Sequence, residues 1–313
     1  MINFQPVKLE HKKIFDEYFT SKRYEGSESS FTNLFMWKEC YKIEWAILDS
    51  FLCIKPEMKG DVYVLPPYGS SEAGLNKVID KLIGYFEESG YPFMMRGISP
   101  EFKDVLEKLS PCQFEFIEER DVFDYVYLLE DLVGLKGRKY SKKRNHIKNF
   151  RKSYPQYQYL PLTKDLIIPC QIRLEEWCIE KGCEDDSSLL CERDAIIAAF
   201  EAFNTLNYIG GVILIDGNVE AFTFGEALNN DTVIIHAEKA NQNINGLYQT
   251  INQEYLANHW THMKYVNREE DLGIEGLRQA KLSYYPTQLI TKYQALLKSE
   301  VQHGNKDTHP KGY

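Results

Sequence analysis

Three alternating segments in the second half of the chain constrain its fold more than any other feature. They run over residues 208–215, 219–226 and 232–238, and the turn-forming stretches Asp216-Gly217-Asn218 and Asn229-Asn230-Asp231 separate them. Short polar turns between alternating apolar runs are typical of antiparallel hairpins. These segments therefore predict a three-stranded meander. The residues that follow predict a helix over 246–260, a strand over 262–267, a helix over 274–285, and a final strand and terminal segment over 286–297.

The first half of the chain follows the same order of elements. After helical regions at 9–19 and 31–39, it predicts strands at 44–54 and 61–65, a helix at 75–86 that Gly90 ends, a strand at 91–96, a helix at 100–109, and a closing strand pair at 114–117 and 122–129. Helical segments at 166–181 and 189–204 begin the second copy. Gly97-Ile98-Ser99 and Gly273-Ile274-Glu275 recur before the later helix of each half, which favours a duplication.

The length of the chain fits this organisation. A chain of 313 residues, 43% of them hydrophobic, can form two domains that each bury a core. We therefore predict an α/β (α+β) protein with two copies of one mixed unit, at 1–134 and 135–300, followed by a mobile polar tail at 301–313.

A basic segment lies between the two halves of an otherwise acidic chain. Residues 136–152 carry nine cations and no carboxylate, although the net charge of the chain is −9. The nine are Lys136, Arg138, Lys139, Lys142, Lys143, Arg144, Lys148, Arg151 and Lys152. If the segment is helical, Tyr140, Ile147, Phe150 and Tyr154 dock on the protein, and Lys139, Lys142, Lys143 and His146 face outward. Such a face attracts phosphate-rich ligands, and the alternative is a solvated helix that serves solubility.

The cysteine content, the apolar runs and the net charge exclude several classes of protein. Seven cysteines without a C-x-x-C pair are typical of reduced thiols, and their spacing matches no zinc site, so we expect neither a disulfide framework nor a metal. No leader and no run of 18 apolar residues is present, which predicts a cytoplasmic protein without integral membrane association. Because the net charge is negative, we do not expect the surface as a whole to bind double-stranded nucleic acid non-specifically.

Two motifs resemble a known family. Lys136-Gly137-Arg138-Lys139-Tyr140, followed by Lys143-Arg144-Asn145 and Phe150, is similar to the basic helix that opens the C-terminal domain of phosphatidylglycerol lysyltransferases. The block from Asn267 to Arg278, with Lys281 and Tyr285-Pro286, resembles the stretch after the fifth strand in relatives of that domain. The resemblance implies two tandem GNAT (N-acetyltransferase-like) domains with mixed central sheets flanked by helices. It also implies an architecture like that of the Fem peptidoglycan aminoacyltransferases, which move an aminoacyl group from tRNA to an amine or hydroxyl.

Two acyl donors, aminoacyl-tRNA and acyl-CoA, remain alternatives for this sequence. GNAT enzymes that use acyl-CoA hold its pyrophosphate on a glycine-rich turn before a helix. Here that stretch is Asn243-Ile244-Asn245-Gly246-Leu247-Tyr248, with a single glycine and a bulky tyrosine. Aminoacyl-tRNA is therefore the favoured donor and acyl-CoA the alternative. We expect Asn243, Gly246 and Tyr248 to bind substrate in either case, together with Lys139, Lys142, Lys143 and Arg144 of the basic segment.

Candidate catalytic groups lie on the predicted meander. Strand alternation predicts that Ile234, His236 and Glu238 share one side of the third strand, and that Phe222, Phe224 and Glu226 share a side of its neighbour. Glu226, His236 or Glu238 would deprotonate an attacking amine. The alternative for His236 is a hydrogen-bonded packing residue.

Further candidates follow the fifth strand. Glu269, Glu270 and Asp271 predict a site for an ammonium group, where like-charge crowding would raise one carboxyl pKa; the alternative is that Asp271 caps the next helix. Asn267, Arg268, Arg278 and Lys281 would bind substrate, with the cations balancing these acids or reaching a phosphate. Tyr284 would protonate a leaving group or stack on a base, unless it is a core residue.

Together these residues predict an aminoacyl or acyl transferase with a small-molecule or peptide acceptor and tRNA as the favoured partner. The hypothesis requires the basic helix to face the acidic strand end across a shared cleft. The rival hypotheses are an acyl-CoA N-acyltransferase and a non-catalytic binding module on the same scaffold.

Overall fold

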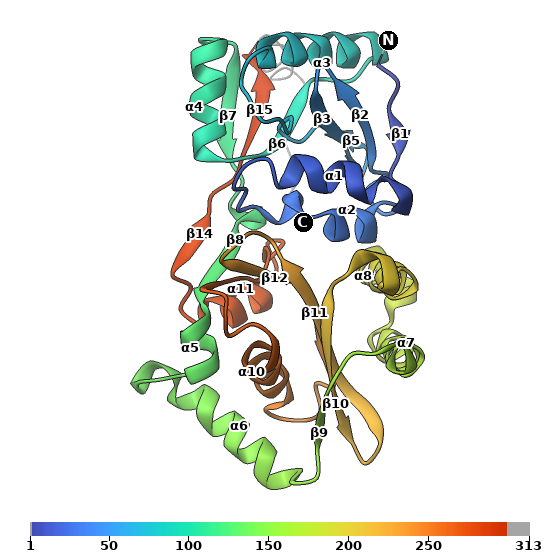
Figure 1. The fold of residues 1–313 in the computed structure, drawn as a ribbon, viewed down its shortest axis with the longest axis vertical. Coiled ribbons are helices and arrows are strands. Elements are labelled where there is room, and N and C mark those ends of the chain that lie inside the picture. The colour runs from blue at the N-terminus through green and yellow to red at the C-terminus, as the bar shows by residue number, and fades with distance from the viewer. Residues whose placement is uncertain (1, 299–313) are drawn as a thin grey trace. The chain divides into compact units, whose positions relative to one another are not determined.

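A computed structural model describes residues 2–298 of the chain, and the tail predicted at 301–313 lies outside them. The described residues form two compact units (Figure 1). Unit 1 contains residues 2–22, 38–123 and 291–298; unit 2 contains residues 23–37 and 124–290.

The units are discontinuous in sequence, which differs from the predicted boundary at residue 134. Strand β8 (Asp124–Leu128) and helix α5 (Leu129–Gly134) precede that boundary but belong to unit 2. The segment 23–37 also joins unit 2, and strand β15 (Tyr293–Leu297) returns to unit 1. Sequence order fails here because sheet pairing links segments that are far apart along the chain.

Unit 1 is built from short strands and three α-helices. Its elements are β1 (Gln5–Pro6), η1 (Leu9–His11), α1 (Lys12–Phe19), β2 (Glu44–Leu48), β3 (Phe51–Lys55), β4 (Glu57–Met58), β5 (Asp61–Val62), α3 (Leu75–Ser89), β6 (Met94–Ile98), α4 (Pro100–Leu109), β7 (Phe114–Glu118), η3 (Arg120–Val122) and β15. The strands form three small sheets, in the orders β1-β2-β3, β6-β15-β7 and β4-β5.

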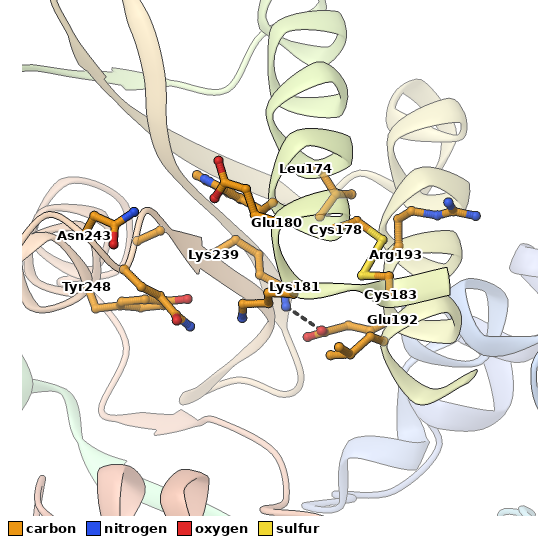
Figure 2. Close-up of a pocket in the computed structure, with 14 residues that line it drawn as sticks. Leu174, Cys178, Glu180, Lys181, Cys183, Glu192, Arg193, Lys239, Asn243 and Tyr248 are labelled. Carbon is orange, nitrogen blue, oxygen red and sulfur yellow. Dashed lines mark ion pairs between the residues drawn. A yellow bond between two sulfur atoms is a disulfide. The ribbon is translucent and has the colours of Figure 1, made fainter. Parts of the chain in front are cut away.

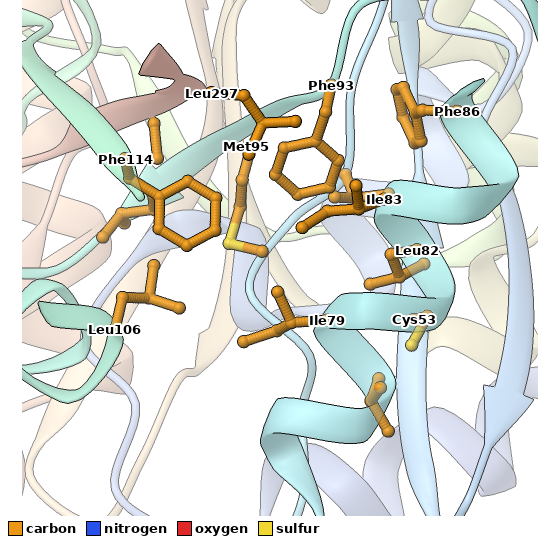
Figure 3. Packing of buried hydrophobic residues seen from close by; sticks show 14 of the residues in the cluster. Cys53, Ile79, Leu82, Ile83, Phe86, Phe93, Met95, Leu106, Phe114 and Leu297 are labelled. Atoms are coloured by element: carbon orange, nitrogen blue, oxygen red, sulfur yellow. The ribbon is translucent and has the colours of Figure 1, made fainter. Parts of the chain in front are cut away.

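Helix α3 supplies the core of unit 1, as its helical spacing predicts. Its buried residues include Ile79, Leu82, Ile83 and Phe86, and they pack with residues of β6, β7, β15 and α4 and with the residue that precedes β6 (Figure 3). The partners are Phe93, Met95, Leu106, Phe114 and Leu297. Burial of each such side chain contributes about 1.5–3 kcal/mol, so this cluster holds together strands that would be too short to be stable alone.

Unit 2 has one large sheet. Its elements are η2 (Ser27–Ser29), α2 (Phe31–Trp37), β8, α5, η4 (Arg138–Tyr140), α6 (Ser141–Ser153), β9 (Gln158–Pro161), α7 (Lys164–Lys181), η5 (Cys183–Asp185), α8 (Ser187–Glu201), α9 (Phe203–Leu206), β10 (Ile209–Ile215), β11 (Asn218–Ala227), β12 (Thr232–Ala240), α10 (Leu247–His259), β13 (Tyr265–Asn267), α11 (Glu275–Leu282) and β14 (Gln288–Ile290). The seven strands have the order β14-β8-β13-β12-β11-β10-β9.

The meander β10-β11-β12 is confirmed as antiparallel, and β12 then pairs with β13 in parallel. The predicted pairing of segments 114–117 and 122–129 is wrong: β7 pairs with β15, whereas β8 lies between β13 and β14. Alternation shows that a segment is a strand but not which strand it joins.

Helices cover both faces of the unit 2 sheet, with α7 and α8 on one side and α10 on the other (Figure 1). Cys178 of α7 and Cys183 form a disulfide, so the prediction of reduced thiols is wrong for this pair. Cys53, Cys112 and Cys170 are free thiols. In the described part of the chain, no helix combines the length and apolar composition needed to cross a membrane.

Candidate active site

Strands β12 and β13 diverge after a short region of pairing. They pair only from Thr232 to Ile234 in β12, although β12 continues to Ala240. After Asn267 the chain leaves the sheet as the loop 268–274, and no strand among residues 2–298 pairs with this edge of β12 beyond Ile234. Side chains at the end of β12 are therefore accessible to groups from the loop and from neighbouring helices.

A β-bulge lies at the start of this divergent region. Phe224 pairs with Ala237 and Gly225 pairs with Ile235, which leaves His236 as the extra residue of β12. A bulge shifts the alternation of side chains by one position and redirects those that follow.

The bulge corrects the predicted arrangement of the strand. His236 points to the α7–α8 face, where its ring lies 6.4 Å from that of Phe224 and its Nε2 lies 3.3 Å from Glu226. Glu238 points to the opposite face and accepts a hydrogen bond from Asn252 of α10 at 2.8 Å. His236 and Glu238 therefore do not share a side, because strict alternation ignores the inserted residue.

His236 lies between two carboxylates. Its Nδ1 is 3.1 Å from Glu269 Oε1 and its Nε2 is 3.3 Å from Glu226 Oε1. Burial opposes the charged form, but the hydrogen bonds and charges of the two glutamates outweigh it and raise the pKa of His236 to about 9. Burial likewise opposes ionisation of Glu226, and hydrogen bonds from His236 and neighbouring hydroxyls reverse this and lower its pKa. At neutral pH the histidine is an imidazolium, which makes it a poor base.

The N-terminal segment of unit 2 completes this cluster. Ser30 and Thr32 donate hydrogen bonds to Glu226 at 2.5 and 3.0 Å, and Asn33 donates to Glu269 at 3.0 Å. These three residues carry no local signal in the sequence, because their partners lie about two hundred positions away. Each of these side chains is thereby hydrogen-bonded to another member of the cluster, an arrangement typical of a structural polar core.

A second cluster lies on the α10 face of the sheet. Arg268 donates a hydrogen bond to Glu238 at 2.9 Å, and its guanidinium lies 5.0 Å from the ring centre of Tyr284 and 5.8 Å from that of Tyr127. The buried Nη1 of Arg268 has no hydrogen-bond partner among the described residues. Burial raises the pKa of Tyr284, which therefore stays protonated. The cluster thus holds one unused cationic donor in a buried site.

Helix α6 brings a second cation to the same tyrosine. Lys143 places its Nζ 4.0 Å from the ring centre of Tyr284. Burial, and then the neighbouring charge of Arg268, lower the pKa of Lys143 to about 8. Lys143 therefore points inward, which corrects the prediction that it faces solvent. The predicted docking face is confirmed, since Tyr140, Ile147 and Phe150 are buried.

The other cations of the basic segment remain on the surface. Lys139 pairs with Asp131 at 3.5 Å and Arg151 with Glu254 at 2.8 Å, while Arg144 donates to the carbonyls of Leu135 and Gly137. Five exposed cations have no hydrogen bond or ion pair within the described structure. They are Lys136, Arg138, Lys142, Lys148 and Lys152. The segment thus carries uncompensated positive charge.

The loop after β13 is held by its own charged residues. Asp271 is fully buried and receives two hydrogen bonds from Arg278, at 2.7 and 2.9 Å, one from Tyr125 and one from the Gly273 amide. Burial opposes its ionisation, but these donors prevail and lower its pKa, so Asp271 is not the carboxyl whose pKa like-charge crowding would raise. The amide contact at Gly273 supports a structural role for this carboxylate.

Two further predicted residues also brace the loop. Lys281 donates to the carbonyls of Arg268, Glu269 and Glu270, at 2.5–3.0 Å, and burial lowers its pKa to about 8. Asn267 donates to Asp124 and accepts from the Glu269 amide. Asn267, Asp271, Arg278 and Lys281 therefore fix the backbone that presents Arg268 and Glu269.

The backbone of α6 packs directly against the turn that precedes α10. Gly246 has a φ of +87°, and a Cβ at this position would lie 2.3 Å from the carbonyl oxygen of His146 in α6. His146 also contacts Asn245 at 2.8 Å. The glycine thus permits close packing of α6 on α10. The neighbouring residues Asn243 and Tyr248 line a cavity of about 380 Å³ with residues of α7 and α8 (Figure 2).

The structure therefore sorts the predicted residues into separate groups. Lys143, Arg268, Glu238 and Tyr284 meet on one face of the sheet. Glu226, His236 and Glu269 meet on the other. The basic helix reaches the first group through Lys143.

Comparisons with known proteins agree with this fold. A sequence profile described as "Phosphatidylglycerol lysyltransferase, C-terminal" matches residues 19–296. A conserved protein of unknown function from Bacteroides thetaiotaomicron has 38% identity and a TM-score of 0.89, over 95% of this chain and 100% of that one. An uncharacterized protein of Mycoplasmoides gallisepticum is 26% identical over 190 residues; the match spans 59% of the length of this curated relative.

Two more distant structures show the fold alone. L-PGS from Bacillus licheniformis has 14% identity and a TM-score of 0.62, over 91% of each chain. A tandem GNAT protein from the clavulanic acid biosynthesis pathway has 8% identity and a TM-score of 0.50, over 95% of this chain and 98% of that one. The tandem GNAT-like architecture predicted from the motifs is confirmed.

Proposed function

Because the chain belongs to the phosphatidylglycerol lysyltransferase C-terminal family, we propose that it transfers an aminoacyl group from an aminoacyl-tRNA to an amine or hydroxyl acceptor. The observation that carries this proposal is the pair of cations on Tyr284, Lys143 from the basic helix and Arg268 from the strand end. Lys143 belongs to α6, whose exposed side is suited to RNA binding. Arg268 follows β13, at the strand end that is suited to the transfer reaction.

The chemistry of ester aminolysis matches the groups in this cluster. The attacking nitrogen forms a bond to the ester carbon, the bond from that carbon to the ribose oxygen breaks, and one proton passes from the nitrogen to the departing oxygen. Arg268 Nη1 is an available donor for the developing oxyanion. With a pKa of about 8, Lys143 can both accept and return the proton near neutral pH.

The exposed side of α6 suits the RNA backbone. Lys142, Lys148 and Lys152 extend along about 15 Å of helix, at a rise of about 1.5 Å per residue. Each phosphate contact adds about 0.7 to 0.9 to the slope of log affinity against log salt concentration. Removal of two lysines therefore lowers that slope by about 1.5.

The test combines a transfer assay with a salt titration. Labelled aminoacyl-tRNA is incubated with the protein and a panel of amines, and transfer and tRNA affinity are measured for three proteins. For the double variant Lys142→Gln/Lys148→Gln, tRNA affinity should be lower, and the slope of log affinity against log salt concentration should fall by about 1.5. The matched control Lys77→Gln/Lys108→Gln removes two exposed lysines from unit 1 and should bind tRNA as the unmodified protein does.

A second pair of variants tests the chemistry. Lys143→Met should reduce the transfer rate by about a hundredfold or more, as expected for loss of acid–base catalysis. Lys142→Met, its exposed neighbour, should leave the rate at saturating tRNA unchanged. Equal rates for the two variants, or no transfer from any aminoacyl-tRNA, would refute the proposal.

Acyl-CoA is the less favoured donor. The backbone of α6 packs on Gly246, at the helix start where a pyrophosphate would bind in acyl-CoA enzymes of this fold. Titration with CoA under the same conditions should therefore give no binding. Acetyl transfer from labelled acetyl-CoA would favour the alternative.

A further inference from the structure

The Arg268 guanidinium is connected by hydrogen bonds to a residue of helix α10. Its Nη2 donates to Glu238 Oε1 at 2.9 Å, and the other oxygen of that carboxylate, Oε2, accepts from Asn252 Nδ2 at 2.8 Å. Asn252 lies in the middle of α10, Glu238 lies near the end of β12, and Arg268 directly follows β13. Three elements of unit 2 are thus joined by one chain of hydrogen bonds.

Asn252 is a polar residue on the buried side of its helix. Its exposed fraction is 1%, and its neighbours on that side, Ile251, Tyr255 and Leu256, are fully buried core residues. A buried side-chain amide is unfavourable unless it is hydrogen-bonded. The amide of Asn252 donates to Glu238, so the carboxylate explains why a polar side chain is stable at this position.

Glu238 is held at both of its oxygens. One accepts from Arg268 and the other from Asn252, and the side chain of Glu238 is only 10% exposed. Without Asn252, Oε2 would lose its donor in a site with little access to water, and the carboxylate would turn in search of another. Such a turn would also move the oxygen that holds Arg268.

The aromatic rings around Arg268 do not replace this hydrogen bond. Tyr284 and Tyr127 lie with ring centres 5.0 and 5.8 Å from its Cζ and restrict where the guanidinium lies, but an aromatic face does not distinguish the two terminal nitrogens. Glu238 does so, because it binds Nη2 and leaves Nη1 without a partner among residues 2–298. A donor that is oriented before the reaction stabilises developing negative charge better than one that must reorient.

We propose that Asn252 is a positioning residue for the transfer reaction: it holds Glu238, which in turn holds Arg268 with Nη1 free for the oxyanion. The proposal rests on the proposed function, since Arg268 is the donor in that reaction. Asn252 acts through two other side chains, and no proton or bond of the transfer passes through it. Its loss should therefore reduce the transfer rate at saturating tRNA and leave tRNA affinity unchanged.

The charge of Glu238 provides a second way to detect this arrangement. The ionisable groups around the Lys143 ammonium include Tyr284, Arg268 and Glu238. Burial and then the charge of Arg268 lower the pKa of Lys143, and the charge of Glu238 opposes both effects. Glu238→Gln removes that opposing charge and keeps the shape of the side chain, so the pKa of Lys143 should fall below its value of about 8.

The orientation of Arg268 is tested without tRNA, by nitrogen-15 NMR of arginine side chains in the full chain. Arg268→Lys identifies the signals. In the unmodified protein, rotation about the Nε–Cζ bond should be slow, and the two terminal nitrogens of Arg268 should give separate signals. In Asn252→Leu, exchange between them should be about tenfold faster, which corresponds to about 1.4 kcal/mol.

Gln253→Leu is the matched control. Gln253 is the next residue of α10, and its amide also bonds outside the helix, to the Val133 carbonyl at 2.7 Å and to Arg151 at 3.3 Å. Both substitutions replace an amide by leucine and should lower the melting temperature, but only Asn252→Leu should speed exchange at Arg268. If Asn252→Leu does not fold, Asn252→Ala and Gln253→Ala take the places of the two leucine variants.

Two results of the NMR experiments would overturn the proposal. One is equal exchange at Arg268 in the Asn252 and Gln253 variants. The other is an unchanged pKa of Lys143 in Glu238→Gln, measured by NMR titration of the lysine side chain, because the carboxylate would then not lie where the chain of hydrogen bonds requires it.

The transfer assay separates this proposal from the proposed function. A rate at saturating tRNA that is about tenfold lower for Asn252→Leu than for Gln253→Leu, with equal tRNA affinity, supports both. Normal transfer by Asn252→Leu despite faster exchange at Arg268 overturns the positioning role and leaves the proposed function intact. Slow exchange in a protein that transfers from no aminoacyl-tRNA overturns the proposed function and the positioning role with it.

Discussion

Substitution of Gly246 by alanine should separate the cost of an unusual backbone conformation from the cost of lost helix packing. Gly246 precedes α10 with φ +87° and ψ −3°. An alanine Cβ would lie 2.3 Å from the His146 carbonyl oxygen and 3.0 Å from Phe150 Cβ. Ordinary contacts between heavy atoms begin near 3.5 Å, so α6 must move by about 1 Å.

Two other glycines provide matched controls. Gly74 precedes α3 with φ +86° and ψ −3°, and Gly217 in the β10–β11 turn has φ +81°. A Cβ at either position meets nothing within 4 Å. Gly74→Ala matches the backbone geometry of Gly246, and Gly217→Ala lies in the same unit.

The expected magnitudes follow from this comparison. An alanine with positive φ costs about 1–2 kcal/mol, which each control should show, less about 0.4–1 kcal/mol regained through the unfolded chain. Gly246→Ala adds an overpacking cost of about 1–3 kcal/mol. Its total loss of unfolding free energy is therefore about 3 kcal/mol, against about 1 kcal/mol for the controls.

The assay is urea unfolding followed by tryptophan fluorescence. Trp37, Trp177 and Trp260 lie in unit 2 and report on the unit that contains α6, whereas Trp45 lies in unit 1 and reports on the unit that contains Gly74. Transfer activity should fall by about a hundredfold for Gly246→Ala, because a displacement of about 1 Å moves Lys143 out of place. A Gly246→Ala protein as stable and active as Gly217→Ala would refute the packing argument.

Three further predictions concern the polar clusters. The pKa of His236 is raised in the folded state, so its stabilising contribution is complete below pH 6.5 and is lost as pH rises through about 9. The difference in unfolding free energy between the unmodified protein and His236→Gln should shrink by about 3 kcal/mol between pH 6 and pH 10; a constant difference contradicts the buried imidazolium. Asp271→Ala should lose about 3–5 kcal/mol of unfolding free energy, because it removes the buried carboxylate that Arg278, Tyr125 and the Gly273 amide bind, and Asp271→Ala/Arg278→Met should regain part of it; a double variant less stable than the single one contradicts this. Lys281→Met should increase hydrogen exchange at residues 268–270, whose carbonyls it binds, and unchanged exchange would disprove its bracing role.

The sequence by itself determined the elements of the second unit. Residues 208–238 form the predicted meander, and the helix predicted over 246–260 is α10 (Leu247–His259). These features depend on side-chain period and turn residues, which act over a few positions. The basic segment and the loop motif likewise identified the family, because they are local patterns.

Tertiary structure decided which of these residues meet. The bulge at His236 depends on the pairing of β11 with β12, and it moves Glu238 to the opposite face of the sheet. Ser30, Thr32 and Asn33 reach Glu226 and Glu269 only because segment 23–37 folds into unit 2. None of these contacts has a signature in the local sequence.

The fate of the charged residues shows the same division. The sequence gives the positions of Lys143, Asp271 and Lys281, but their roles follow from burial and from the donors and acceptors around them. Lys143 turns inward because α6 docks through Ile147 and Phe150, which places it over Tyr284. The Asp271 carboxylate accepts hydrogen bonds from Arg278 and the Gly273 amide, and the Lys281 ammonium donates to the carbonyls of residues 268–270. Hydrogen bonding and desolvation depend on three-dimensional neighbours, so they are fixed only when distant segments pack together.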